Sequence, residues 1–223
     1  MRPSIIIPLL NEAPNLPALT RQLAPLVQAG VEVLFVDGGS QDGSASLAEA
    51  AGFRVIRSRR GRACQMNAGA TASHGDTLIF LHADTALPTD ALQAIDASLR
   101  TGREWGRFDV HIAGRPWMLG IVARMMNWRS RITGIATGDQ AMFMTRQAFE
   151  SLGGFPDQPL MEDIEMSRRL LARSRPACLR SKVTTSGRRW ESRGVWRTIF
   201  LMWRLRWNYW RGVPASRLAE AYR

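Results

Sequence analysis

The first hundred residues alternate short apolar runs with stretches of helical periodicity, and this alternation restricts the fold more than any other feature of the chain. The runs predict strands at Ser4–Pro8, Val31–Val36, Arg54–Ile56 and Thr77–Leu81. The segments between and after them predict helices at Leu16–Ala29, Ser44–Ala51, Cys64–Ala72 and Thr89–Arg100. Such alternation is typical of an α/β fold whose mostly parallel sheet is covered by helices on both faces.

Polar residues directly follow three of the four predicted strands. The three clusters begin at Asn11, Asp37 and His82. In a parallel sheet the carboxyl ends of the strands meet at one edge, and ligands bind there. We therefore expect the three clusters to line one pocket.

The cluster after the second strand contains a carboxylate, Asp37, followed by Gly38, Gly39 and Ser40. Glycines bring the backbone close to a ligand without side-chain obstruction, so Asp37 is a candidate acceptor for a base or ribose donor. An ordinary turn that leads into the next helix is the alternative.

The cluster after the fourth strand is His82-Ala83-Asp84. Residues i and i+2 of an extended segment point the same way, so His82 and Asp84 are expected to face one site. Asp84 can ligate a hard divalent cation that is bound to phosphates. The alternative is that Asp84 and Thr85 only begin the next helix.

A basic loop lies between the third strand and its helix. Its four arginines surround Gly61: Arg57, Arg59, Arg60 and Arg62. Arginines that lead into a helix start suit a phosphate ligand, although a solvated charged loop has the same composition.

The second half of the chain predicts strands at Phe108–Ile112 and Ala141–Thr145, and helices at Pro116–Ile132, Glu162–Ala172 and Val195–Arg211. Two adjacent acids, Glu162 and Asp163, open one of these helices. A carboxylate is stabilised as the anion at a helix N-terminus, so capping is the simpler role. One of the two acids could instead face the pocket and take a proton from an acceptor hydroxyl.

Six segments follow one another in an order that resembles the family 2 glycosyltransferases with the GT-A fold. They are SIIIPLLNE, VDGGSQDGS, the Arg-Gly-Arg…Gln-Met-Asn-Ala-Gly segment, FLHADT, GDQAMF and GGFPDQPLMEDIEMSRRL, across roughly residues 4–172. The sequence is most similar to short bacterial members, some of which are labelled arsenosugar-biosynthesis glycosyltransferases. The resemblance implies a Rossmann-like nucleotide-diphospho-sugar transferase scaffold with a mostly parallel central sheet and, here, C-terminal amphipathic helices.

The resemblance also implies where a nucleotide-sugar donor of the UDP or GDP type would bind. The donor-binding positions are Pro8, Asn11, Glu12, Asp37, Gly39, Arg62, Asn67, His82, Ala83 and Asp84. Asp84 corresponds to the last acid of the D-x-D motif, which coordinates Mg²⁺ or Mn²⁺ on the diphosphate. His82 occupies the first position of that motif, where an acid is usual. It could ligate the metal through nitrogen, which suits Mn²⁺ better, or hydrogen-bond the diphosphate.

Asp163 corresponds to the catalytic base of the family, and Glu162 and Asp139 would shape the acceptor side. The implied reaction is a single displacement that inverts the anomeric carbon. Two other functions stay open. A nucleotidyltransferase on the same scaffold usually has a Gly-rich loop with Lys or Arg after the first strand, whereas Leu10–Pro14 stands here. A non-enzymatic basic protein would bind RNA or lipid.

The charge is uneven: the net charge is +11, but residues 100–223 hold 23 basic and 10 acidic side chains. No nucleic-acid-binding module is visible, so we expect no nucleic-acid partner. In the predicted C-terminal helix, tryptophans and arginines both recur every seven residues. The tryptophans are Trp196, Trp203 and Trp210, and the arginines are Arg197, Arg204 and Arg211. This pattern is typical of a helix at an anionic membrane surface, although packing on the catalytic domain is the alternative.

We predict a catalytic domain over residues 1–187 and a basic helical extension over residues 188–223. The nucleotide-binding part of the domain would be residues 1–100, and the acceptor side residues 101–187. Two cysteines cannot form a disulfide framework, and no apolar run approaches the ~18 residues of a membrane span. The expected location is the cytoplasm, with peripheral contact to the inner membrane face. The acceptor and a homo-oligomeric state stay open.

Overall fold

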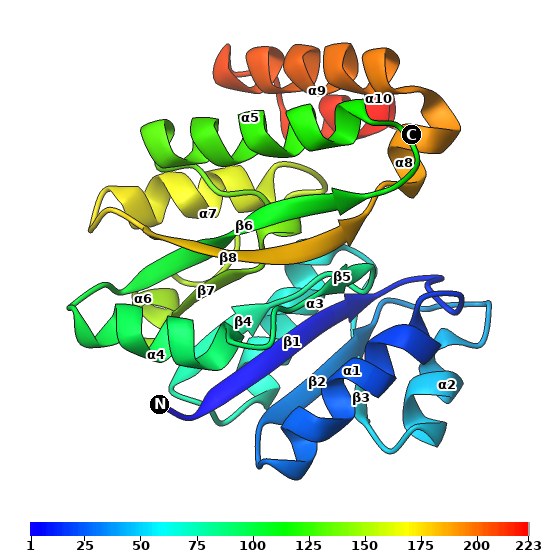
Figure 1. Ribbon diagram of the computed structural model, residues 1–223, viewed down its shortest axis with the longest axis vertical. Coiled ribbons are helices and arrows are strands. Elements are labelled where there is room, and N and C mark those ends of the chain that lie inside the picture. The colour runs from blue at the N-terminus through cyan, green and yellow to red at the C-terminus, as the bar shows by residue number, and fades with distance from the viewer. Residues whose placement is uncertain (223) are drawn as a thin grey trace.

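The computed structural model describes residues 1–222 and contains one mixed eight-stranded sheet in the order β3-β2-β1-β4-β7-β6-β8-β5. The four N-terminal strands are parallel to one another, as the alternation predicted (Figure 1). Their bounds are β1 Pro3–Leu9, β2 Glu32–Asp37, β3 Arg54–Arg57 and β4 Thr77–Phe80. The helices that follow are α1 Leu16–Gln28, α2 Ser44–Ala50, α3 Arg62–Ala72 and, after a short strand, α4 Ala91–Arg100.

The second half of the sheet is partly antiparallel. Strand β7 (Met142–Thr145) runs antiparallel to both β4 and β6 (Trp105–Ala113). Strand β8 (Ala177–Ser186) lies parallel to β6, and the two-residue β5 (Thr85–Ala86) pairs with β8. Neither β5 nor β8 was expected from the sequence. The remaining elements are α5 Met118–Thr133, the 3-10 turn Gly138–Gln140, α6 Arg146–Ser151, α7 Glu162–Leu171, α8 Arg188–Arg193, α9 Val195–Trp210 and α10 Ala215–Tyr222.

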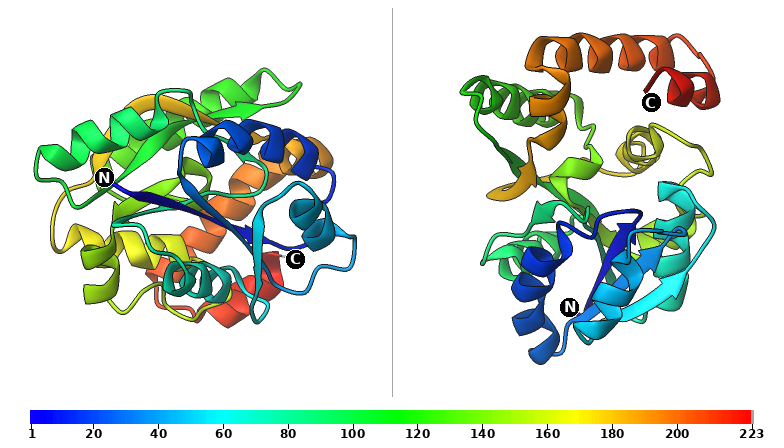
Figure 2. Two further views of the ribbon diagram at one scale, coloured as in Figure 1. Left: turned by 90° about the horizontal axis from the view of Figure 1, so that it is seen from below. Right: turned by 90° about the vertical axis from the view of Figure 1, so that its right-hand side faces the viewer.

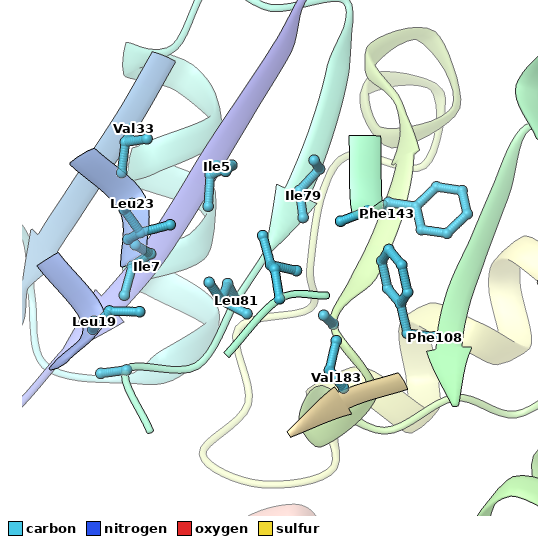
Figure 3. Packing of buried hydrophobic residues seen from close by; sticks show 14 of the residues in the cluster. Ile5, Ile7, Leu19, Leu23, Val33, Ile79, Leu81, Phe108, Phe143 and Val183 are labelled. Carbon is cyan, nitrogen blue, oxygen red and sulfur yellow. The ribbon is translucent and has the colours of Figure 1, made fainter. Parts of the chain in front are cut away.

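Alternate residues of the buried strands belong to two separate hydrophobic layers, one on each face of the sheet. Ile5 and Ile7 of β1 point to the layer that holds α1, α4 and α5, whereas Ile6 points to the layer under α3, α6 and α7. Figure 3 shows the first layer from close by, with residues from both halves of the sheet meeting in it. On the other face, α3 lies so close to β1 that a Cβ on Gly69 would sit 2.4 Å from Cγ2 of Ile6. The helix–sheet distance therefore requires a glycine at this position.

The C-terminal helices α9 and α10 pack on the rest of the chain through a third apolar cluster. Leu205 of α9 and Leu218 of α10 contact Leu160 and Met161, which immediately precede α7. These helices lie at the end of the molecule away from α1 and α2 (Figures 1 and 2). None of the helices in residues 1–222 is both long and apolar enough to cross a membrane.

Candidate active site

A cleft of about 520 Å³ opens at the carboxyl ends of β1 and β4. Its walls come from both halves of the chain: the end of β1, the start of α3, the loop after β4, the ends of β6 and β8, the 3-10 turn, the loop before α7, and the C-terminal helices. Seven of the predicted site residues line it: Pro8, Glu12, Arg62, His82, Ala83, Asp84 and Asp139. Fold topology thus brings together side chains that lie up to about half the chain apart.

The other six predicted residues fall outside the set of described residues that line the cleft: Asn11, Asp37, Gly39, Asn67, Glu162 and Asp163. Two of them organise the turn after β2. The Asp37 carboxylate accepts hydrogen bonds from the backbone N–H groups of Gly39 and Ser40, at 3.0 and 3.1 Å. The Asn11 side chain accepts from the N–H of Gln41 at 2.9 Å. In this geometry they hold the rim of the site.

Asn67 connects α3 to the loop before α7. Its amide donates to the carbonyl of Phe155 at 2.8 Å and accepts from the N–H of the same residue at 2.9 Å. Both ends of the side chain are thereby used within the fold. Asn67 therefore ties α3 to this loop, and the donor contact that the resemblance implied for it stays a prediction.

Gln65 is a site residue that the sequence interpretation did not select. It lines the cleft while being only 3% exposed. Its Nε2 donates to the carbonyls of Leu9 and Val36, at 2.8 and 2.7 Å, and so joins the ends of β1 and β2. Gly38 leaves room for this side chain, since a Cβ there would lie 2.9 Å from Gln65 Cδ.

Asp84 is held at the cleft by the strand pair β5–β8. Its carbonyl accepts from the N–H of Ser186 at 3.1 Å, and its carboxylate accepts from the Thr85 hydroxyl at 3.3 Å. Thr85 belongs to β5, and α4 begins only at Ala91. The alternative that Asp84 and Thr85 begin a helix is therefore wrong.

His82 faces the 3-10 turn that carries Asp139. Its Nδ1 lies 3.3 Å from Asp139 Oδ1. A Cβ on Gly138 would lie 2.3 Å from its Nε2, and that buried nitrogen has no hydrogen-bond partner among the described residues. The ring therefore packs between Gly138 and Asp139.

The site fits a cation that arrives with a phosphate ligand better than a cation held by protein alone. No group of three or more His, Cys, Asp or Glu side chains within residues 1–222 is arranged to enclose a metal ion. Mg²⁺ in phosphate-handling sites is commonly held by one or two carboxylates together with substrate oxygens. Asp84 supplies such a carboxylate, while the Nδ1 of His82 is directed at Asp139.

The acidic pair at the start of α7 connects to the cleft through Arg62. Glu162, only 2% exposed, forms an ion pair with Arg62 at 3.1 Å. Asp163 accepts hydrogen bonds from the N–H groups of Gly138 at 2.8 Å and Ile164 at 2.7 Å. Burial and then the neighbouring charge of Glu162 raise the pKa of Asp163 to about 6, although these hydrogen bonds and Arg62 oppose the rise. This carboxyl group is thus suited to exchange a proton near neutral pH.

The C-terminal helices close one end of the cleft with arginine. Arg188 of α8 pairs with Glu12 at 3.3 Å. The guanidinium of Arg189 lies 3.5 Å from the ring centroid of Tyr222, whose carbonyl it also binds at 3.0 Å. The polar edge of the parallel strands therefore faces a basic, aromatic wall.

The sequence profile described as Glycosyl transferase family 2 matches residues 4–152. The chain belongs to this family. One relative is the undecaprenyl-phosphate 4-deoxy-4-formamido-L-arabinose transferase of Pseudomonas aeruginosa, which is 34% identical over 100 residues. The match covers 40% of this chain but only 30% of that protein. The narrower similarity to members labelled for arsenosugar biosynthesis stays a prediction.

Solved structures confirm the GT-A fold. Glucosyl-3-phosphoglycerate synthase from Mycobacterium tuberculosis, in complex with Mn²⁺, UDP and glucosyl-3-phosphoglycerate, superposes with a TM-score of 0.63 at 19% identity. The match covers 81% of this chain and 70% of that one. The mannosyltransferase PcManGT from Pyrobaculum calidifontis, in complex with GDP-Man and Mn²⁺, gives a TM-score of 0.61 at 20% identity and covers 82% and 56% of the two chains.

Proposed function

We propose that this protein is a glycosyltransferase that moves a sugar from a nucleotide-diphosphate donor to an acceptor hydroxyl or lipid phosphate, with inversion. One observation carries the proposal. In a chain of family 2, Asp84, Arg62 and Asp139 converge on a single cleft at the carboxyl edge of the parallel strands. That edge is where α/β sheets bind nucleotides.

The donor would lie along the N-terminal side of the cleft. Pro8 and Glu12 would contact the base and ribose, with the Asp37 turn at the rim of that subsite. Arg62 would meet the diphosphate, since it reaches the cleft from the start of α3. Support for a UDP- or GDP-type donor comes from solved relatives of the fold that hold UDP or GDP-Man.

Asp84 would hold a divalent cation, Mg²⁺ or Mn²⁺, beside the diphosphate. When bound, such a cation neutralises the negative charge that develops on the leaving nucleotide. The Mn²⁺ ions in the solved relatives support this role. Arg62 would add fixed positive charge on the same side of the cleft.

Asp163 would act as the general base, taking the proton of the acceptor as it attacks the anomeric carbon from the face opposite the leaving group. A carboxyl with a pKa of about 6 is ionised at pH 7 yet remains a competent proton acceptor. Asp139, which lines the cleft and contacts His82, would orient the acceptor. Glu162 would hold Arg62 in place through their ion pair.

We further propose that the protein works in the cytoplasm with peripheral contact to the inner membrane face. A lipid-phosphate acceptor is supported by the relative whose name specifies undecaprenyl phosphate. The boundary between a catalytic part, residues 1–187, and an extension from residue 188 is retained as a proposal. The extension contributes Arg188 and Arg189 to the cleft wall.

The rival functions make different predictions in a binding experiment. A thermal-shift series with UDP-, GDP- and TDP-sugars, each with and without Mn²⁺, is the direct test. We expect one donor class to stabilise the protein, more strongly with Mn²⁺, and Asp84→Ala to remove the Mn²⁺ increment. Failure of every nucleotide sugar to raise the melting temperature would reject the glycosyltransferase proposal.

A further inference from the structure

Helix α9 presents a continuous aromatic band to the outside of the molecule. Its members are 58 to 77% exposed: Trp196, Phe200, Trp203, Trp207 and Trp210. At ~100° per residue they fall within an arc of about 80°. Neighbouring rings touch along the band, with centroids 6.4 Å apart for Trp196 and Phe200 and 5.2 Å apart for Trp207 and Trp210.

Helix α5 carries a second apolar band of the same width. Its members are 43 to 79% exposed: Trp117, Ile121, Met125, Trp128 and Ile132. The opposite side of α5, including Leu119 and Val122, is buried in the main core. The apolar band is therefore not the face that packs the helix on the rest of the chain. The same is true of α9, whose buried residues Thr198 and Leu205 lie outside its aromatic band.

The charged side chains on helices α5 and α9 themselves are all positive. Neither α5 nor α9 contains an aspartate or glutamate. Exposed arginines flank the α9 band at about 60–100° from its centre, and Arg124 flanks the α5 band at about 60°. The flanking arginines of α9 are Arg197, Arg204 and Arg211. Two copies of such a surface would place arginine against arginine, which disfavours self-association.

Helices α5 and α9, which carry the two bands, lie at the same end of the molecule, opposite α1 and α2 (Figures 1 and 2). Helix α9 also connects this end to the cleft, because Thr198 and Met202 line the cleft from its inner side. One helix thus has aromatic residues outside and cleft residues inside.

We propose that the exposed bands of α5 and α9 together form a docking surface for an anionic lipid bilayer. Tryptophan prefers the boundary between headgroups and acyl chains, and arginines beside it bind lipid phosphate. Apolar residues on one helix face then insert shallowly while the helix lies in the plane of the interface. The docking proposal depends only on the residues of this surface. Its consequence, that α9 brings the cleft to a lipid-borne acceptor, rests on the proposed function.

Vesicle sedimentation tests the proposal with phosphatidylcholine vesicles and with vesicles containing 30% phosphatidylglycerol. We expect the full chain to bind the anionic vesicles at least tenfold more tightly, and to lose most of this difference in 0.5 M NaCl. The double variant Trp203→Ser/Trp207→Ser should weaken binding to anionic vesicles at least tenfold, and Arg197→Glu/Arg204→Glu should do the same.

Two matched controls carry exposed residues far from the surface: Leu47→Ser on α2, where the side chain is 45% exposed, and Arg21→Glu on α1. Both should bind within twofold of wild type. Quenching of tryptophan fluorescence by brominated acyl chains gives a second readout on the unmodified protein, and quenching is expected. Nucleotide sugars should raise the melting temperature of the surface variants as much as that of wild type. A loss of vesicle binding with an unchanged thermal shift would therefore concern the docking surface and not the proposed activity.

Three results would overturn the proposal. The first is absence of wild-type binding and quenching with anionic vesicles. The second is equal binding by the wild type and by both surface variants. The third is a wild-type protein that does not bind vesicles and forms a dimer in analytical ultracentrifugation, when the variant Trp203→Ser/Trp207→Ser is monomeric. The bands would then be a subunit interface.

Discussion

Asp163 combines burial with a fixed hydrogen-bond geometry, and both bear on its chemistry. The N–H groups of Gly138 and Ile164 orient its carboxylate, while burial and Glu162 raise its pKa to about 6. Asp139, one residue beyond Gly138, lines the cleft itself. The two carboxylates are therefore neighbours with separable roles.

Replacing Asp163, the proposed general base, should slow sugar transfer and leave the affinity for the donor nearly unchanged. We expect Asp163→Asn to lower kcat by about 10²–10⁴-fold, the usual contribution of a general base, with donor affinity changed less than about threefold. Wild-type kcat should fall as pH drops below about 6, because the carboxyl is then protonated. Asp139→Asn is the matched control. Loss of the pH-dependent step in Asp139→Asn, with near-normal kcat in Asp163→Asn, would assign the base to Asp139.

The raised pKa of Asp163 also predicts how the stability of the fold changes with pH. The folded-state pKa of Asp163, about 6, lies above its ordinary value of 3.8. Its contribution to stability is therefore fully present below pH 3.8 and is lost as pH rises through 6. In urea denaturation, wild type should lose stability relative to Asp163→Asn between pH 4 and pH 7. If wild type instead gained stability relative to Asp163→Asn between pH 4 and pH 7, the hydrogen bonds and Arg62 would stabilise the ionised carboxylate more than burial destabilises it.

At this scale seven of the thirteen predicted site residues line the cleft, and the sequence did not predict what each one contacts. His82 and Asp84 were selected as strand-end residues, Arg62 as part of a basic loop and Asp139 through the family resemblance, and all four line the cleft. Gln65 was not selected, because its role depends on two carbonyls, 56 and 29 residues away, that come together only in the folded sheet.

At the scale of elements, helix α3 depends on Gly69 for its distance to β1. A methyl group there would meet Ile6 Cγ2 at 2.4 Å, in a layer where Ile6 is fully buried. Overpacking of this kind costs typically about 1–3 kcal/mol. Gly69→Ala should therefore lower the free energy of unfolding by that amount in urea titration.

Gly120 in α5 provides the matched control, since a Cβ there meets nothing within 4 Å. Gly120→Ala should leave stability unchanged or raise it by up to about 1 kcal/mol, because alanine favours a helix. Equal effects of the two substitutions would show that the α3–β1 contact relaxes without cost.

Elements with strong periodicity were predictable to within a few residues, whereas those defined by pairing were not. Helices α1, α7 and α9 follow their apolar spacing closely. Strand β8 contains Arg180 and Lys182 and is only half-buried over much of its length, so its pattern does not stand out from a loop. Its position depends on its long pairing with β6, which no local pattern reports.

At the scale of the whole molecule, the parallel strands supply one side of the cleft and the basic second half supplies the other. Each half contributes both signs of charge to the cleft: Arg62 and Asp84 come from the first hundred residues, and Asp139 and Arg189 from the rest. Helix α9 packs on the protein through Leu205, as one sequence-based alternative expected, while its aromatic face stays exposed and contact with a membrane stays a prediction.

The metal requirement belongs to this scale as well, because a cation at Asp84 would act together with the arginines of the cleft. We expect EDTA to abolish turnover and Mn²⁺ to restore it, whereas Asp84→Ala should stay at least about a hundredfold less active at any Mn²⁺ concentration. The control is Asp90→Ala on the exposed loop before α4, which should respond to Mn²⁺ like wild type. Full activity in EDTA would show that the reaction requires no divalent cation.

The most direct test of the central claim is a donor screen by mass spectrometry, with pooled nucleotide sugars, Mn²⁺ and the purified protein. We expect one sugar nucleotide to be consumed, its nucleoside diphosphate to be released, and Asp84→Ala to stop the reaction. Consumption of none of the sugar nucleotides would contradict the claim. So would pyrophosphate release from a nucleoside triphosphate and a sugar phosphate, since that product identifies a nucleotidyltransferase.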